Sequence, residues 1–194
     1  MHGDAYLDLR LGDFLERLGT GKPAPGSGSA SALTVAFAAG LVAMVARRSD
    51  GWEDSPGIAA QALALQARAA PLALTDAQVW EQALDALAAA GDDRATPNGE
   101  LEEKLDLSAA VPLQIAETAA DTASLAALAA ELGEGTYRPD AAAAAVLAAA
   151  GARAAAHLVA VNLTVQDGDA RLDRARASEQ VAAEAAARAL DSAR

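Results

Sequence analysis

The sequence predicts an all-α protein, a bundle of five to six helices in which two Ala/Gly-rich helices are largely buried. Of its 194 residues, 53% are apolar but only 3% are aromatic. The core is therefore built from Ala, Leu and Val, whose small side chains favour close helix packing over sheet formation. Two stretches, 30–46 and 140–165, carry almost no charge and are expected to be buried helices. Because so much burial is difficult within one short bundle, we also expect a homodimer.

The first two helices are predicted from spacing and end signals. An amphipathic first helix has apolar residues at helical intervals and ends at the glycines and proline of 19–23; its apolar positions are Leu7, Leu11, Phe14, Leu15 and Leu18. The second helix covers about 29–48, where two arginines suit a helix C-terminus. Within it, Ala32, Ala36 and Gly40 fall four residues apart, so another helix should approach that face closely.

Prolines, glycines and loop segments divide the rest of the chain into helical stretches. After a loop at 49–57, a helical stretch covers 58–90, and Pro71 should kink or split it. An exposed loop at 91–99 precedes a stretch at 100–132, in which Pro112 marks either a kink or the true helix start. The buried helix at 140–165 follows, and a helix at about 170–193 has a weaker apolar face suited to loose packing or to assembly. We expect one domain over 1–194.

Composition excludes several classes of protein. The net charge of −12 argues against nucleic-acid binding, which usually requires a basic face. The absence of cysteine excludes disulfides and thiolate chemistry, and the only histidines, His2 and His157, have no metal-ligand spacing. We expect no metal. The polar N-terminus predicts no signal peptide and a cytoplasmic protein, and the segment 30–46 is better explained as a core helix than as a membrane span.

The most informative segment is Pro25-Gly26-Ser27-Gly28-Ser29, which leads directly into the second helix. Glycines allow a ligand to approach the backbone, and the first turn of a helix offers unpaired N–H groups. The alternative is an ordinary helix start capped by Ser27 or Ser29.

The run from 14 to 46 resembles the cyclodeaminase/cyclohydrolase family, the folate domain of formiminotransferase-cyclodeaminase and its free-standing methenyltetrahydrofolate cyclohydrolase relatives. Members have F-L-x-x-L, then P-x-P-G-G-G-S, then a small-residue helix ending in A-x-M-V. Further similar segments follow in the family's order over about 10–166, leaving 170–194 as an extra C-terminal helix. They are Leu74-Thr75-Asp76-Ala77, Val111-Pro112-Leu113-Gln114-Ile115-Ala116-Glu117, Pro139-Asp140-Ala141 and Val161-Asn162-Leu163.

This resemblance implies an all-helical dimer with folate pockets near the subunit interface, and an enzyme of one-carbon metabolism. The reaction is hydrolysis of 5,10-methenyltetrahydrofolate or, as the less favoured choice, deamination of formiminotetrahydrofolate. The absence of a formimino-transfer domain favours hydrolysis. Neither reaction needs a metal or redox cofactor, because a carboxylate and hydrogen-bonding groups suffice.

The resemblance also implies the site residues. Asp140 is the first candidate for the catalytic carboxylate and Asp76 the second, the alternatives being a helix cap and a first-turn acid respectively. The substrate-binding candidates are Pro25, Gly26, Ser27, Gly28, Ser29, Arg47, Arg138 and Asn162. Asn162 lies in an apolar helix, so it bonds either a neighbouring backbone or the ligand. Arg47 and Arg138, with Arg48 and Lys22, could meet folate carboxylates or be ordinary solvated charges.

Some positions depart from the family pattern. Ser27 replaces the second glycine of G-G-G, Pro139 replaces a serine, and Leu158 and Ala160 stand where the family has Asn and Arg. These replacements motivate the alternative function, a non-catalytic helical dimer that binds folate or acts as a scaffold.

Overall fold

In the computed structural model, residues 6–90, 99–163 and 169–193 are described, and all regular structure in these ranges is helical. The chain is an all-α protein. The elements are η1 (Tyr6–Asp8), α1 (Leu11–Leu18), α2 (Ser27–Arg47), α3 (Ser55–Ala69), α4 (Leu72–Ala90), α5 (Gly99–Leu132), η2 (Gly135–Tyr137), α6 (Arg138–Asn162) and α7 (Ala170–Ser192).

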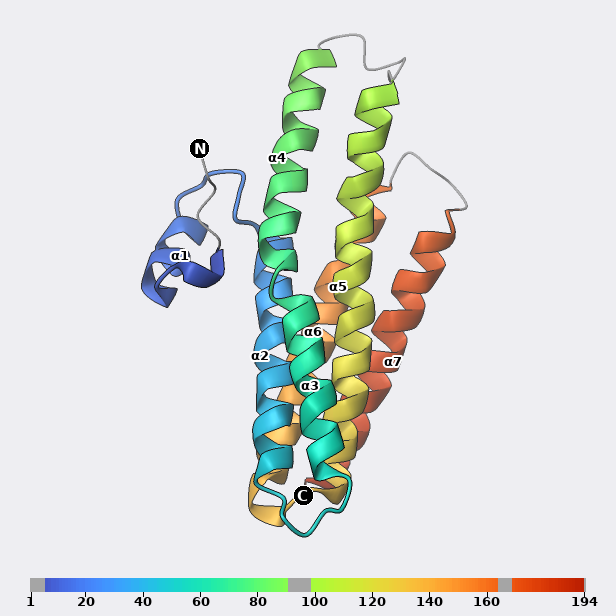
Figure 1. Ribbon diagram of the computed structural model, residues 1–194. Helices are drawn as coiled ribbons and strands as arrows, with labels where there is room; N and C mark the ends of the chain where they lie inside the picture. Colours follow the sequence, from blue (N-terminus) through green and yellow to red (C-terminus); the bar gives the residue numbers. More distant parts are fainter. Residues whose placement is uncertain (1–5, 91–98, 164–168, 194) are drawn as a thin grey trace.

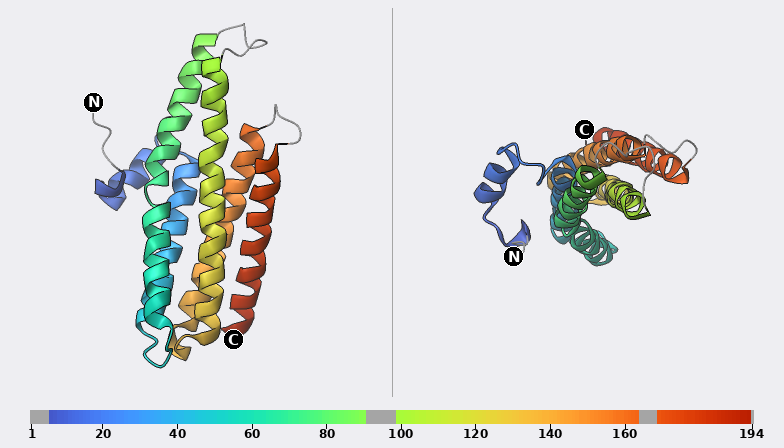
Figure 2. Two further views of the ribbon diagram at one scale, coloured as in Figure 1. Left: turned by 45° about the vertical axis from the view of Figure 1, so that its right-hand side comes forward. Right: turned by 90° about the horizontal axis from the view of Figure 1, so that it is seen from above.

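Helices α2 to α7 form a six-helix bundle, and α1 stands off its side (Figure 1). The central helix is α5, which contacts α2, α3, α4, α6 and α7. Seen along the bundle, the α3–α4 pair and α7 flank α5 on its two sides (Figure 2). Pro71 splits the third helical stretch as predicted, and α3 and α4 continue end to end in the same direction.

The core consists mainly of alanine. Its largest fully buried aliphatic side chains are Ile115, Val35, Val42, Val45 and Val159. Close approach of α2 and α3 is confirmed at Gly40, where an added Cβ would lie 2.8 Å from Nε2 of Gln66 on α3. That amide donates a hydrogen bond to the Ala36 carbonyl. On the other side of α2, a Cβ at Gly151 of α6 would lie 2.7 Å from Val35.

Three predictions about the helices were wrong. The 140–165 helix is not buried all round, because α6 leaves Val146, Leu147 and Val161 exposed. Of the two alternatives for the C-terminal helix, loose packing is wrong and assembly stays a prediction: α7 contacts α5 and α6, and Asp169 caps it by accepting a hydrogen bond from the Arg171 backbone N–H. Residues 7–18 do not form one helix, and the leucines of that pattern are exposed. The predicted loop at 91–99 falls almost entirely outside the described residues.

Two helical segments, Ser27–Arg47 and Gly135–Asn162, are long and apolar enough to cross a membrane. Within the bundle, 61% of the most apolar window of the first and 44% of that of the second are buried. Core helices of soluble proteins share this length and composition.

Candidate active site

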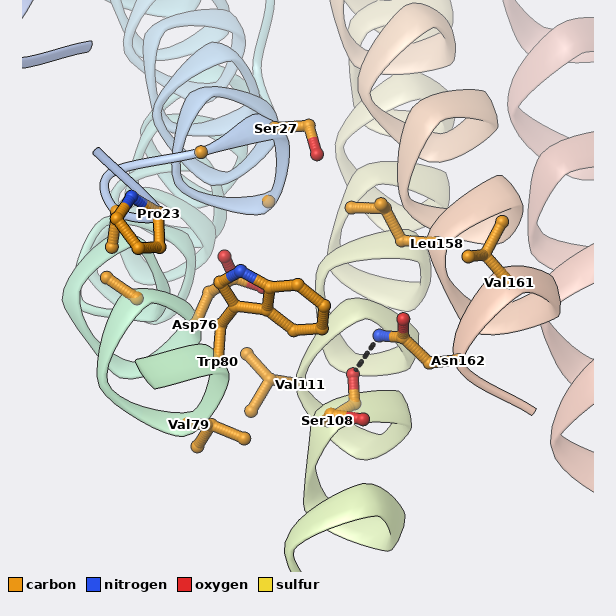
Figure 3. A pocket seen from close by; sticks show the side chains of 14 residues that line it. Pro23, Ser27, Asp76, Val79, Trp80, Ser108, Val111, Leu158, Val161 and Asn162 are labelled. Carbon is orange, nitrogen blue, oxygen red and sulfur yellow. Dashed lines mark hydrogen bonds between the residues drawn. The ribbon is translucent and has the colours of Figure 1, made fainter. Parts of the chain in front are cut away.

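A pocket of about 280 Å³ lies where α2 begins and α6 ends (Figure 3). Its walls come from the segment before α2, the first turn of α2, the N-terminal half of α4, and parts of α5 and α6. The lining residues are Pro23, Ala24, Gly26, Ser27, Gly28, Asp76, Ala77, Val79, Trp80, Ser108, Val111, Leu158, Val161 and Asn162. Most of these side chains are apolar or small, and the only ionisable one among them is Asp76.

Asp76 caps α2 from a different helix. Its carboxylate accepts a hydrogen bond from the Ser29 backbone N–H in the first turn of α2. The N-cap residue itself is Gly26, and no side chain at that position makes a cap bond. The Ser29 hydroxyl instead donates to the Ala73 carbonyl at 2.7 Å. The expectation that Ser27 or Ser29 caps this helix was therefore wrong.

Burial controls the charge of Asp76. Removal from water raises its pKa from 3.8 to about 6, and the Ser29 hydrogen bond opposes this increase without cancelling it. At neutral pH the group is mostly ionised, yet its pKa is close enough to 7 for it to take up a proton and release it again. These are the properties of a general base.

Gly28 is required by the position of this carboxylate. A Cβ built at Gly28 would collide with the carboxylate atoms of Asp76. The glycine therefore serves close packing of an acidic group against the start of α2, and not an unusual backbone conformation, because Gly28 lies within the helix.

Asn162 closes the pocket on the α6 side. Its Nδ2 donates to the Ser108 carbonyl at 2.6 Å (Figure 3). Ser108 lies four residues before Pro112, which has no N–H to offer that carbonyl. One N–H of Asn162 is used in this way, and its Oδ1 is the atom that can accept a hydrogen bond from a ligand. Of the two alternatives for Asn162, the bond to a neighbouring backbone is present, and contact with a ligand stays a prediction.

The predicted site residues fall into two groups. The pocket brings together Gly26, Ser27, Gly28, Asp76 and Asn162. Two further members of the motif adjoin it: Ser29 is buried beneath, and Pro25 lines a neighbouring cavity that also includes Lys22 and Arg17.

Asp140, Arg47 and Arg138 lie at the other end of the bundle. Asp140 and Asn162 are at opposite ends of α6, about 33 Å apart at 1.5 Å per residue. Asp140 is exposed in the first turn, whereas the N-cap residue is Tyr137, so Asp140 is not the helix cap that was considered. Arg138 donates to the Gly133 carbonyl, and Arg47 is the exposed last residue of α2.

Sequence reasoning missed Trp80, Ser108 and Leu158 as pocket residues. Trp80 follows Asp76 by four residues, so the helical period places both on one face of α4. That spacing was visible in the sequence. The contribution of α5 was not, because it depends on which helices meet. Among the described residues, no group of three or more His, Cys, Asp or Glu side chains is arranged to hold a metal ion.

Comparison with known proteins identifies the family of the chain. The family model for formiminotransferase-cyclodeaminase matches residues 10–181, a range that includes the whole pocket. The chain belongs to the formiminotransferase-cyclodeaminase family. The family match extends past the 10–166 range predicted from motifs and into α7.

The fold is shared with a solved structure. The crystal structure of formiminotetrahydrofolate cyclodeaminase from Thermotoga maritima, at 2.80 Å resolution, has a TM-score of 0.85 against this chain. The likeness covers 96% of each chain at 24% sequence identity, so it concerns the fold. No curated protein sequence gives a significant match.

Proposed function

We propose that this protein hydrolyses 5,10-methenyltetrahydrofolate, with Asp76 as the catalytic carboxylate. Family membership supports a folate one-carbon function. The observation that carries the assignment is a single carboxylate, with its pKa raised by burial to about 6, in a mostly apolar pocket. Such a site favours a flat ligand that carries positive charge, and the methenyl group is a cationic amidinium carbon between two ring nitrogens.

The chemistry needs one proton carrier. Water adds to the methenyl carbon while its proton passes to the Asp76 carboxylate, and a neutral carbinolamine forms. One carbon–nitrogen bond then breaks as Asp76 returns the proton to the departing nitrogen. Loss of the hydroxyl proton to solvent leaves the formyl group. Overall, one methenyl cation and one water molecule are consumed, and one neutral formyl folate and one proton are produced.

Deamination of formiminotetrahydrofolate is the second candidate. The structural relative from Thermotoga maritima is named for that reaction. Deamination involves the same one-carbon unit as hydrolysis: a ring nitrogen attacks the formimino carbon and ammonia leaves. Because the formimino group is also cationic when protonated, the same pocket and the same carboxylate would serve.

A folate-binding or scaffold role without turnover is the third candidate. Leu158 lines the pocket where the family pattern has Asn, so one polar group is replaced by an apolar wall. Ala160 removes a second polar group, the arginine of that pattern.

One set of measurements separates the three candidates. Purified protein is mixed with methenyltetrahydrofolate, and the decay of its absorbance is compared with the decay in buffer alone. Hydrolysis predicts a rate proportional to protein concentration. Formation of that absorbance from formiminotetrahydrofolate would indicate deamination. Calorimetric binding of a reduced folate without either reaction would support the third candidate. Addition of EDTA should not change the hydrolysis rate, because the proposed step uses only water and a carboxylate.

We also propose that the protein is a homodimer. Large apolar side chains of α2 and α6 are exposed in the single chain, among them Phe37, Val146, Leu147 and Val161. The leucines of η1 and α1 are exposed as well, on an arm that stands off the bundle (Figure 1). A second copy would cover these surfaces. Light scattering coupled to size-exclusion chromatography should give twice the mass of the chain. The double variant Val146→Glu/Leu147→Glu should reduce the measured mass to that of a single chain.

A further inference from the structure

Trp80 is the only aromatic side chain that lines the candidate pocket in the described part of the chain. It lies one helical turn after Asp76 on α4 and is 37% exposed. Figure 3 shows its indole projecting across the pocket beside Asp76, toward the side formed by α5 and α6.

We propose that the indole face of Trp80 is the stacking platform for the planar ring of the ligand, and so determines the site's selectivity for flat, cationic rings. In naming that ring as the reduced pterin with its one-carbon bridge, the inference rests on the proposed function. Trp80 is a binding and positioning residue in this scheme, and Asp76 performs the proton transfer.

The surroundings of Trp80 suit such a ligand. An indole face carries negative electrostatic potential and attracts a cation placed over it more strongly than any other side-chain ring. Leu158 and Val161 of α6 line the pocket as apolar groups, so a flat ring lying on the indole would meet little polar surface there. The polar atoms lie at the edges of the pocket. They are the Asp76 carboxylate and the side-chain amide oxygen of Asn162, and the nitrogen of that same amide donates to the Ser108 carbonyl. Both accept hydrogen bonds, and the edge of a pterin presents N–H donors.

The helical register adds a second argument. Residues four apart on a helix are neighbours on one face, so a ring stacked on Trp80 has its edge near the Asp76 carboxylate. This arrangement would hold the electrophilic carbon close to the proton carrier without any movement of α4.

The two tryptophans of the chain make the test direct. Trp52 lies in the turn between α2 and α3, at the far end of α2 from the pocket, and is buried. In Trp52→Phe, the intrinsic fluorescence reports Trp80 alone; in Trp80→Phe, it reports Trp52 alone. Each protein is titrated with 5-formyltetrahydrofolate, a stable reduced folate, and with p-aminobenzoylglutamate, the half of folate that lacks the pterin.

We expect saturable quenching and a spectral shift of Trp80 by 5-formyltetrahydrofolate, a much smaller response of Trp52, and no response to p-aminobenzoylglutamate at the same concentration. An unchanged Trp80 spectrum while calorimetry shows binding would overturn the proposal. Equal quenching by p-aminobenzoylglutamate would also overturn it, because the ring on Trp80 would then be the other half of the ligand.

Kinetics supply the second readout. Trp80→Ala should raise KM for methenyltetrahydrofolate at least about tenfold with a smaller change in kcat. The KM of Trp80→Phe should stay within about threefold of the wild-type KM. Trp80→Leu is the matched apolar control. If Trp80→Leu performs as well as Trp80→Phe, the side chain is an apolar filler and the stacking role fails. Circular dichroism melts confirm that each variant is folded.

The two proposals fail in different ways. A protein that hydrolyses methenyltetrahydrofolate with Trp80 unaffected by ligand would retain the proposed function and lose the stacking role. A protein without turnover in which 5-formyltetrahydrofolate still quenches Trp80 would retain the stacking role and lose the reaction.

Discussion

Asn162 at the end of α6 donates a hydrogen bond to the Ser108 carbonyl of α5, the carbonyl to which Pro112 has no N–H to offer. This contact explains how α5 continues through a proline over 34 residues. It also fixes the orientation of the Asn162 amide at the wall of the pocket. A side chain predicted to bind ligand thus has a structural partner of its own.

The coupling between Asn162 and Pro112 is measurable. Asn162→Ala removes a donor to a buried segment and should cost about 1 kcal/mol of unfolding free energy. Pro112→Ala restores a backbone N–H to the Ser108 carbonyl, so the Asn162→Ala change should cost less in a Pro112→Ala background. A double-mutant cycle in urea should give a coupling of about 1 kcal/mol. Strict additivity would show that the two residues act independently.

Asp76→Asn should abolish most of the activity. The amide keeps the shape and can still accept the Ser29 hydrogen bond, but it carries no proton in the reaction. We expect the enzymatic rate, corrected for the buffer rate, to fall about a hundredfold or more. In wild type, kcat/KM should rise with pH through about 6, since the ionised form is the base and its pKa lies there. A pH-independent kcat/KM between 5 and 7 would contradict the assignment.

Asp140→Asn is the matched comparison for that experiment. The resemblance makes Asp140 the first candidate and Asp76 the second, yet Asp140 is exposed at the end of α6 remote from the pocket. We expect the turnover of Asp140→Asn to stay within about twofold of the wild-type value. A hundredfold loss in this variant would move the catalytic role away from Asp76 and indicate that Asp140 reaches a site through another copy of the chain.

The same Asp76→Asn variant should be more stable than wild type at alkaline pH. The folded-state pKa of about 6 lies above the ordinary 3.8, so folding favours the protonated form. The stability that this group contributes is therefore fully present below about pH 4 and is lost as the pH rises through 6. Relative to wild type, the variant should gain about 2 kcal/mol between pH 4.5 and 8. Urea unfolding at the two pH values provides the measurement, and a difference that does not change with pH would refute the raised pKa.

Gly28→Ala tests the close packing of the acid against α2. The added methyl group would meet the Asp76 carboxylate, so we expect a loss of about 1 to 3 kcal/mol in stability and a large loss of activity. Gly57→Ala is the control: it also lies in the first turn of a helix, and nothing stands within 4 Å of its added Cβ. It should be neutral or slightly stabilising. Shortening the acid in Gly28→Ala/Asp76→Ala should recover stability, but not activity.

Local signals in the sequence were sufficient for most of the fold. The proline at 71 predicts the break between α3 and α4, and the small residues of α2 predict its close neighbours. The same local reasoning could not decide the fate of Pro112, because the donor that replaces its missing N–H comes from Asn162, 50 positions later. The family resemblance ranked Asp140 above Asp76. Both are acids near helix starts, and the packing of α4 against α2 is what buries Asp76.

The alanine core has a consequence for how stability varies with temperature. An alanine side chain has no rotamers to lose on burial, so each core position orders at little side-chain entropy cost. It also removes less apolar surface from water than leucine or phenylalanine would. Because the heat capacity of unfolding follows that surface, this bundle should have a heat capacity change below the usual 12–15 cal/mol/K per residue, and a correspondingly flat stability curve. Such a protein would change little in stability between cold and warm conditions, even if its maximum stability were modest.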